Sequence, residues 1–148
     1  MTSDVRELYQ AVILDHHKHP RNFRALEGGR HAEGCNPLCG DRVTVYVRVE
    51  DGVITDATFQ GSGCAVSKAS ASLMTDSVTG KTVAESEALS ERFHRLITAP
   101  PDASIEDLGT LSVFAGVRRF PARIKCASLA WHTFRAAVEL GDQVVSTE

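Results

Sequence analysis

Residues 43–49 alternate between valine and polar or aromatic side chains, and this alternation constrains the fold more than any other feature of the chain. Side chains two positions apart lie on the same face of a β-strand, so the pattern predicts a strand with one buried face. The pair Asp51-Gly52 is typical of a tight hairpin turn, and residues 53–59 carry a second apolar face. Because two strands alone are only marginally stable, we expect a third strand from the segment before Cys39.

Apolar residues at helical spacing predict helices on either side of these strands. The predicted helices cover residues 5–19, 64–80, 83–98 and 121–141, with residues 21–33 as a loop and 102–115 as an irregular acidic segment. The second of these helices is rich in alanine and serine, so we expect it to pack closely against a neighbour. Together the elements predict an α+β fold, in which a small antiparallel sheet of about three strands packs against several helices within a single domain, 1–148.

Composition limits the class of protein. The 148 residues are 43% hydrophobic and 24% charged, which excludes general disorder. The net charge of −3 argues against a nucleic-acid partner, because nucleic-acid binders usually carry a basic surplus. No apolar run approaches the roughly 20 residues needed to span a bilayer, so no membrane association is expected. The N-terminal residues lead directly into a helical pattern without a signal peptide, which predicts a cytoplasmic protein.

The cysteines form the chemically informative pattern. Four cysteines are too few for a disulfide scaffold, and thiols in the cytosol stay reduced. Three of them stand at the ends of predicted elements: Cys39, Cys64 and Cys126. Asp41 lies two residues after Cys39, and in extended backbone two such side chains point the same way. If these element ends converge, three thiolates and one carboxylate form a four-coordinate site suited to Zn²⁺.

Two basic residues flank the last of these cysteines. Arg123 and Lys125 stand beside Cys126, where they can offset the surplus negative charge of three thiolates and a carboxylate around a dication. The chain has no C-x-x-C pair, so spacing alone leaves two other interpretations open. In these, the cysteines are buried packing residues or the ligands of an inert structural metal.

Four stretches spread over nearly the whole chain match a known family. They are Leu8-Tyr9 to Pro20-Arg21-Asn22, Asn36-Pro37-Leu38-Cys39-Gly40-Asp41-Arg42, Gly61-Ser62-Gly63-Cys64 with Ser67-Lys68-Ala69-Ser70-Ala71-Ser72, and Phe120-Pro121-Ala122-Arg123-Ile124-Lys125-Cys126-Ala127. The chain resembles the IscU/NifU-type iron–sulfur cluster assembly family, and within it the SufU branch. Lys125 stands where IscU-like members place a histidine, and the acidic segment resembles an insertion of SufU-like members, here around residues 100–118.

The resemblance implies a fold and a function. It implies an IscU/SufE-like fold and zinc bound by Cys39, Asp41, Cys64 and Cys126. It also implies that Cys39 accepts persulfide sulfur from a SufS-type cysteine desulfurase and that the protein stimulates the turnover of this enzyme. The sulfur then passes to the downstream iron–sulfur assembly machinery. One alternative is a scaffold on which a [2Fe–2S] or [4Fe–4S] cluster forms, because soft thiolate ligands suit both metals. A second alternative is an interaction module with an inert structural zinc.

Two further features receive structural interpretations. Cys35 lies four residues before Cys39 in a predicted loop, and we interpret it as an incidental exposed thiol in preference to a sulfur relay. His16, His17 and His19 end the first predicted helix. We interpret them as favourable charge at a helix C-terminus in preference to a second metal site.

Overall fold

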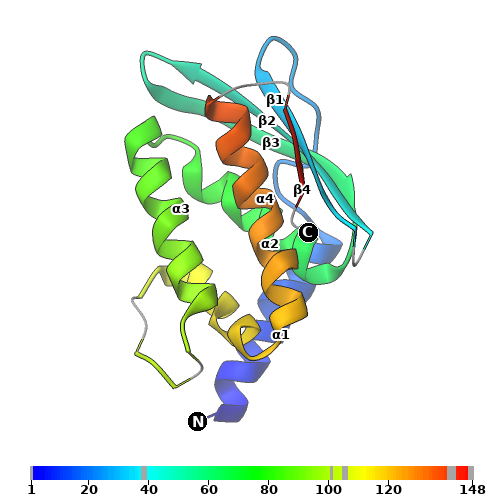
Figure 1. The fold of residues 1–148 in the computed structure, drawn as a ribbon, viewed down its shortest axis with the longest axis vertical. Helices are drawn as coiled ribbons and strands as arrows, with labels where there is room; N and C mark the ends of the chain where they lie inside the picture. The colour runs from blue at the N-terminus through cyan, green and yellow to red at the C-terminus, as the bar shows by residue number, and fades with distance from the viewer. Residues whose placement is uncertain (1, 38–39, 101, 105–106, 140–142, 147–148) are drawn as a thin grey trace.

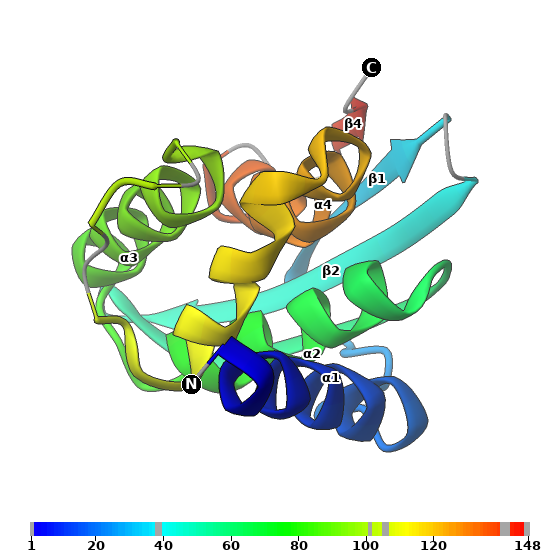
Figure 2. The ribbon, with the colours of Figure 1, turned by 90° about the horizontal axis from the view of Figure 1, so that it is seen from below.

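The computed structural model describes residues 2–37, 40–100, 102–104, 107–139 and 143–146. One mixed sheet and a set of helices on one of its faces make up the molecule (Figures 1 and 2). The strands are β1 (Arg30–Asn36), β2 (Asp41–Glu50), β3 (Val53–Ser62) and β4 (Gln143–Ser146). Their order in the sheet is β3-β2-β1-β4, with β1, β2 and β3 antiparallel and β4 parallel to β1.

The central hairpin agrees with the sequence pattern. Val43, Val45 and Val47 of β2 are buried while their neighbours are partly or fully exposed, so one face of the sheet supports the core. The turn between β2 and β3 places Asp51 and Gly52 at positive φ angles of 52° and 76°. Two successive left-handed residues match the twist of a two-residue hairpin, which confirms the predicted turn.

Helices cover this buried face in two tiers. The helical elements are α1 (Thr2–Lys18), α2 (Ala65–Val78), α3 (Val83–Thr98), the 3₁₀ helix η1 (Gly109–Arg119) and α4 (Pro121–Glu139). Elements α2 and α4 pack on the strands, α1 packs on the outer side of α2, and α3 packs on α4 and η1 (Figure 2). Among the described residues, none of the helices combines the length and apolarity that crossing a membrane requires.

Small residues let the inner helices approach their neighbours closely. Ala69 and Ala71 of α2 are buried, and the Ser70 hydroxyl donates to the Ala127 carbonyl of α4 across 2.5 Å. This contact confirms the predicted close packing of the alanine- and serine-rich helix. On the sheet side, a Cβ at Gly34 would overlap Thr133 Oγ1 of α4, so the absence of a side chain lets α4 lie directly on β1.

The predicted architecture is confirmed, with three local corrections. The predicted loop over residues 21–33 ends earlier, because β1 already begins at Arg30. A fourth strand, β4, was not predicted, and it extends the three-stranded antiparallel sheet. The segment predicted to be irregular contains η1, which buries Leu111, Phe114 and Val117. These residues are three apart, which is the repeat of a 3₁₀ helix and differs from that of an α-helix.

Candidate metal centre

Five elements begin or end at one place on the molecule. The last residue of β1, Asn36, pairs with the first residue of β2, Asp41, and Arg42 pairs with Ser62 at the end of β3. Gly63 and Cys64 then lead into α2, and the first turns of α4 lie opposite. The fold therefore brings side chains from distant parts of the sequence together at this end of the sheet.

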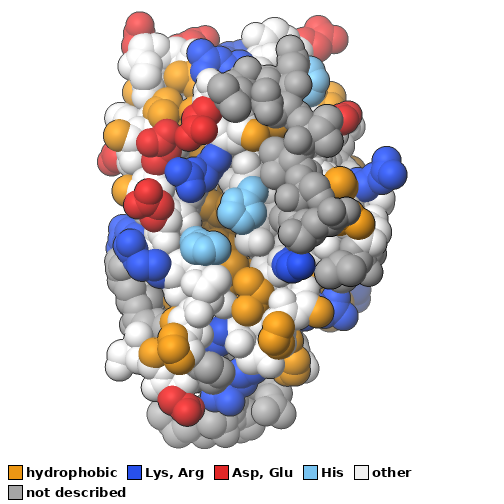
Figure 3. Space-filling model, viewed as in Figure 1, with side chains coloured by type: hydrophobic (Ala, Val, Ile, Leu, Met, Phe, Trp, Pro, Cys, Tyr) orange, Lys and Arg blue, Asp and Glu red, His pale blue; other side chains and the backbone are white. Residues whose placement is uncertain are grey.

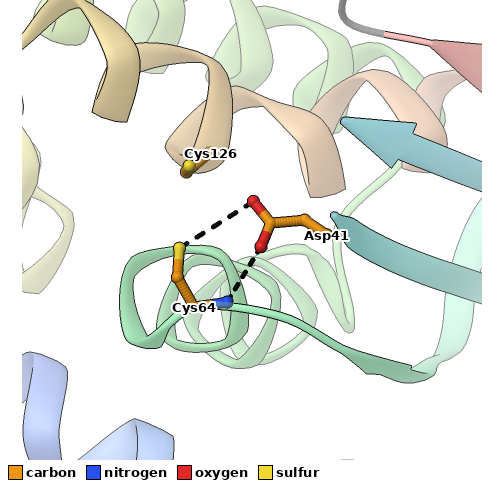
Figure 4. A group of neighbouring side chains, drawn as sticks. All are labelled: Asp41, Cys64 and Cys126. Atoms are coloured by element: carbon orange, nitrogen blue, oxygen red, sulfur yellow. Dashed lines mark hydrogen bonds between the residues drawn. The ribbon is translucent and has the colours of Figure 1, made fainter. Parts of the chain in front are cut away.

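Three of the predicted ligands meet there. One ligand atom from each of Asp41, Cys64 and Cys126 lies within 4.8 Å of the other two (Figure 4). Asp41 and Cys126 are fully buried and Cys64 is half-buried. Burial of a carboxylate beside two sulfurs is unfavourable unless a cation or hydrogen bonds compensate for it, so this grouping is typical of a metal site.

The Asp41 carboxylate is held in a fixed orientation. The Cys64 backbone N–H donates to Asp41 Oδ1 across 2.8 Å, and Cys64 Sγ lies 3.8 Å from Asp41 Oδ2 (Figure 4). One carboxylate oxygen is thus anchored and the other faces the sulfur. A Cβ at Gly63 would overlap Asp41 Oδ1, so this position must lack a side chain for the carboxylate to fit. The predicted role of the Gly-Ser-Gly stretch in close backbone approach is confirmed here.

Both sulfurs are also oriented by hydrogen bonds. Cys64 is the N-cap of α2, and its Sγ accepts from the Ser67 backbone N–H at 3.4 Å. Donors at a helix N-terminus favour negative charge on this sulfur. Cys126 Sγ accepts from Asn36 Nδ2 at 3.7 Å and lies 3.6 Å from the Ala122 carbonyl of the preceding turn. Each sulfur therefore has a set direction before any metal binds.

Asn36 is a site residue that the sequence reasoning did not single out. Its side chain is fully buried and donates to the Cys126 sulfur. Its Oδ1 has no hydrogen-bond partner among the described residues. The available signal was that Asn36 is the first residue of a matched stretch, directly before Pro37. An asparagine before a turn ordinarily indicates only the turn.

The donor set fits a tetrahedral thiophilic metal ion. Tetrahedral zinc has Zn–S of about 2.3 Å and Zn–O of about 2.0–2.2 Å, which places neighbouring ligand atoms roughly 3.5–3.8 Å apart. The 3.8 Å between Cys64 Sγ and Asp41 Oδ2 matches such an edge. Two thiols and one carboxylate leave a fourth position for another ligand. The donor types present, grouped within 4.8 Å of one another, therefore fit Zn²⁺.

The remaining predicted site residues have different positions. Cys39, the predicted sulfur acceptor and fourth ligand, lies outside the described residues. Arg123 is exposed on α4 one turn before Cys126, and Lys125 is half-buried next to it. Their predicted roles in offsetting the charge of the site stay predictions.

Cys35 lies in strand β1, opposite Arg42, and the predicted loop is absent there. It is half-buried rather than exposed. The interpretation of Cys35 as an exposed loop thiol is therefore wrong, because strand β1 continues through Cys35 to Asn36 and the thiol is half-buried.

His16, in the last turn of α1, also differs from the interpretation. His16 is buried, its Nδ1 lies 2.7 Å from Ser72 Oγ, and burial lowers its pKa. A histidine that is disfavoured as a cation contributes packing and a hydrogen bond rather than charge at the helix end. His19, by contrast, is exposed.

Comparison with known proteins decides the family. The family model described as NifU-like N terminal domain matches residues 8–139, which is most of the chain. The chain belongs to the NifU-like N-terminal domain family.

Two curated members of this family are similar over most of their length. The chain is 38% identical to the "Iron-sulfur cluster assembly scaffold protein IscU" of Streptococcus pyogenes serotype M1, over 93% of this chain and 86% of that protein. It is also 38% identical to the "Zinc-dependent sulfurtransferase SufU" of Bacillus subtilis (strain 168), over 88% and 89%. The two names describe different activities within one family.

Solved structures of the family share the fold. A protein from Fervidobacterium islandicum AW-1, described as an iron–sulfur cluster assembly scaffold protein for the SUF system, superposes with a TM-score of 0.82. Its identity is 30%, and the match covers 90% of this chain and 98% of that chain. A NifU-like N-terminal structure from Brucella abortus has a TM-score of 0.77 and 27% identity, with 88% and 92% covered. The α+β fold predicted from the sequence is that of this family.

Proposed function

We propose that this protein is a zinc-dependent sulfur acceptor in iron–sulfur cluster biogenesis. The observation that carries the proposal is the grouping of two thiols and a buried carboxylate, Cys64, Cys126 and Asp41, whose ligand atoms lie within 4.8 Å of one another. In the proposal Cys39 completes this set. It is joined to Asp41 through one residue, and two residues of chain span at most about 7 Å.

The protein groups prepare the site for a dication and for thiolate chemistry. Zinc, when bound, keeps its cysteine ligands deprotonated at neutral pH. Asn36 Nδ2 and the Ser67 N–H donate hydrogen bonds to the Cys126 and Cys64 sulfurs, which orient both sulfurs toward the site. Arg123 and Lys125 are proposed to offset the remaining negative charge from their positions on α4.

Cys39 is the proposed sulfur acceptor. It belongs to the connection between β1 and β2, whereas Cys64 is the N-cap of α2 and Cys126 lies within α4. Its thiolate attacks the terminal sulfur of a persulfide on the donor enzyme. A new S–S bond forms at Cys39, the S–S bond of the donor breaks, and the donor cysteine leaves as a thiolate. The product is a persulfide on Cys39, available for transfer to the assembly machinery.

The proposed donor is a SufS-type cysteine desulfurase. Similarity to a relative named a zinc-dependent sulfurtransferase supports this choice, together with a metal group that contains no histidine among the described residues. Lys125 precedes Cys126 where scaffold-type members place a histidine ligand. Each of these features favours transfer of sulfur over assembly of a cluster on the protein.

A second candidate function is a scaffold for a [2Fe–2S] or [4Fe–4S] cluster. The similarity to relatives named assembly scaffolds supports it, and thiolates bind iron–sulfur clusters as well as zinc. The deciding measurement is metal and sulfide analysis of protein purified without air. Zinc with no visible absorbance is the result expected for sulfur transfer, while iron with acid-labile sulfide supports the scaffold.

The acceptor role is tested with a matched pair of cysteine variants. We expect zinc-loaded protein to gain one sulfur atom, seen by mass spectrometry, after mixing with a persulfidated SufS-type desulfurase. Cys39→Ser should abolish this gain and the stimulation of desulfurase turnover, and Cys35→Ser should preserve both. Undiminished sulfur uptake by Cys39→Ser would exclude the proposed acceptor. If Cys39→Ser lowers the stability of the protein but leaves desulfurase turnover unchanged, the result supports an interaction module with an inert structural zinc.

A further inference from the structure

A cavity of about 320 Å³ lies between α3 and α4, on the side of α4 that packs against α3. Its volume is within the range of small-molecule sites. Trp131 lines it and is five residues, about 7.5 Å along the helix axis, beyond the Cys126 ligand. None of Asp41, Cys64 and Cys126 lines the cavity, and the proposed function gives it no role.

The walls of the cavity are apolar. Phe93 and Ile97 of α3 and Trp131 of α4 line it. The Phe93 and Trp131 rings are stacked, with centroids 4.5 Å apart and an interplanar angle of 17°. These side chains form a rigid surface that favours a flat or aliphatic body over a polar one.

The lining also carries an excess of basic groups. Arg95 and Arg135 line the cavity together with His94 and His132, whose ring centroids are 6.0 Å apart. Figure 3 shows histidine and basic side chains on the face formed by α3 and α4, with apolar and acidic side chains among them. Glu91 is the single acidic residue of the lining. Burial, His94 and Arg135 lower the pKa of His132, in that order of size, which is consistent with a positive local field.

Two buried polar groups of the cavity lining have no hydrogen-bond partner among the residues that the structure describes. Ser90 is 4% exposed and Trp131 is 3% exposed, and both line the cavity. Neither Ser90 Oγ nor Trp131 Nε1 has a hydrogen-bond partner in the described part of the chain. A buried indole N–H can only donate, so it favours an acceptor. Since buried polar groups are nearly always paired in proteins, two orphans at one cavity suggest that a bound molecule completes them.

We propose that the α3–α4 cavity binds a small organic carboxylate with an apolar body. The apolar part lies over Phe93 and Trp131, and the carboxylate accepts hydrogen bonds from Arg135 and, once the buried side chains of Ser90 and Trp131 turn toward the cavity, from their unpaired donors. The lining holds two arginines, Arg95 and Arg135, and one carboxylate, Glu91. This positive surplus disfavours a metal ion or an organic cation in the cavity. Apolar walls disfavour a sugar or a free inorganic anion, which would leave the body of the cavity unfilled.

The chain offers a specific reporter for this site, because Trp131 is its single tryptophan. We would titrate 4-phenylbutyrate into the full-length, zinc-loaded protein and follow the indole N–H cross-peak by NMR. The expected result is a saturable shift with half-saturation near or below about 1 mM, the affinity typical of a ligand this small. The neutral analogue 4-phenylbutan-1-ol should bind at least about tenfold more weakly, because it lacks the charge that Arg135 recognises.

Two variants test the charge recognition. Arg135→Gln should weaken 4-phenylbutyrate binding about tenfold, whereas Glu91→Gln, on the same lining, should preserve or strengthen it. An unshifted Trp131 cross-peak, or equal responses to the acid and the alcohol, would overturn the proposal. So would unchanged affinity in Arg135→Gln. None of these readouts depends on sulfur transfer, so failure here leaves the proposed function of the metal centre unaffected.

Discussion

The ligand atoms of the metal centre and the buried polar atoms of the α3–α4 cavity differ in how they are paired. At the metal centre, Asp41 Oδ1, Cys64 Sγ and Cys126 Sγ each accept a hydrogen bond from a neighbouring N–H group. At the cavity, Ser90 Oγ and Trp131 Nε1 have no partner among the described residues.

This difference in hydrogen bonding indicates which kind of ligand each site favours. Ligands that are already directed lose little conformational freedom when a metal binds, so the metal centre favours tight binding with fixed geometry. Unpaired buried groups destabilise the empty protein and gain from any suitable acceptor, so the cavity favours an exchangeable organic molecule.

The largest expected effect comes from removing a ligand of the metal centre. Cys64→Ala should weaken zinc binding by more than about 100-fold, since loss of groups outside the ligand set already costs about 10- to 100-fold. Competition with a colorimetric chelator measures this affinity. The matched control is Cys35→Ala, which removes a half-buried thiol from β1 and should leave zinc affinity unchanged. Equal losses in both variants would mean that Cys64 is not a ligand.

A methyl group added next to the carboxylate should have the next largest effect. Gly63→Ala places a Cβ against Asp41 Oδ1 and must turn the carboxylate, so zinc affinity should fall about 10- to 100-fold. Gly80→Ala is the control, because it has open space but a φ of +87°. It should cost about 1–2 kcal/mol of unfolding free energy without a change in zinc affinity. Unaltered zinc binding by Gly63→Ala would show that the Asp41 orientation is unimportant.

Two buried serines compare paired and unpaired hydroxyls directly. Ser70 donates to the Ala127 carbonyl, and Ser90 has no partner in the described residues. Ser70→Ala should lower the free energy of unfolding by about 1 kcal/mol, whereas Ser90→Ala should be neutral or stabilising by up to about 1 kcal/mol. Urea unfolding of the zinc-loaded protein measures both. A clear destabilisation by Ser90→Ala would contradict the description of the cavity.

The smallest expected effect concerns the charge of the cavity. His132 has a pKa lowered from 6.5 by burial, His94 and Arg135. Near pH 6.5 and below, His132 is therefore protonated more readily in the unfolded protein than in the folded protein. The free energy of unfolding decreases as the pH falls from 6.5 through the lowered pKa of the folded state. Arg135→Gln should raise the pKa of His132, measured by NMR titration of its imidazole. Arg95→Gln should not, and an unmoved pKa in Arg135→Gln would argue against a positive field.

Regular local patterns were the part of the fold that could be predicted. The valine alternation and Asp51-Gly52 specified the central hairpin, because period-two burial and left-handed turn residues leave few alternatives. The positions of Asp41, Cys64 and Cys126 at element ends made their convergence possible, and the structure groups the three residues. Asn36 was missed, because its role depends on a sulfur that is 90 residues away in sequence.

Other elements had no readable local signal. Strand β1 contains Glu33, Gly34 and Cys35, whose composition does not alternate clearly, and strand β4 has only four residues. Each is a strand because it pairs with a neighbour, and a window of sequence does not contain that neighbour. The α3–α4 cavity was equally invisible, because it depends on the fit between two helices.

The contact between Gly34 and Thr133 bears on the metal centre although neither residue touches it. Gly34 is two residues before Asn36, and Thr133 is two turns after Cys126, so this contact sets how far α4 stands from the sheet. A bulkier residue at position 34 would move α4 away from the sheet. The distances from Cys126 to Asp41 and Cys64 would then increase, although residue 34 is not one of the ligands. Selectivity between metal ions of different radius could thus be tuned by side-chain volume at a site with no coordinating atom.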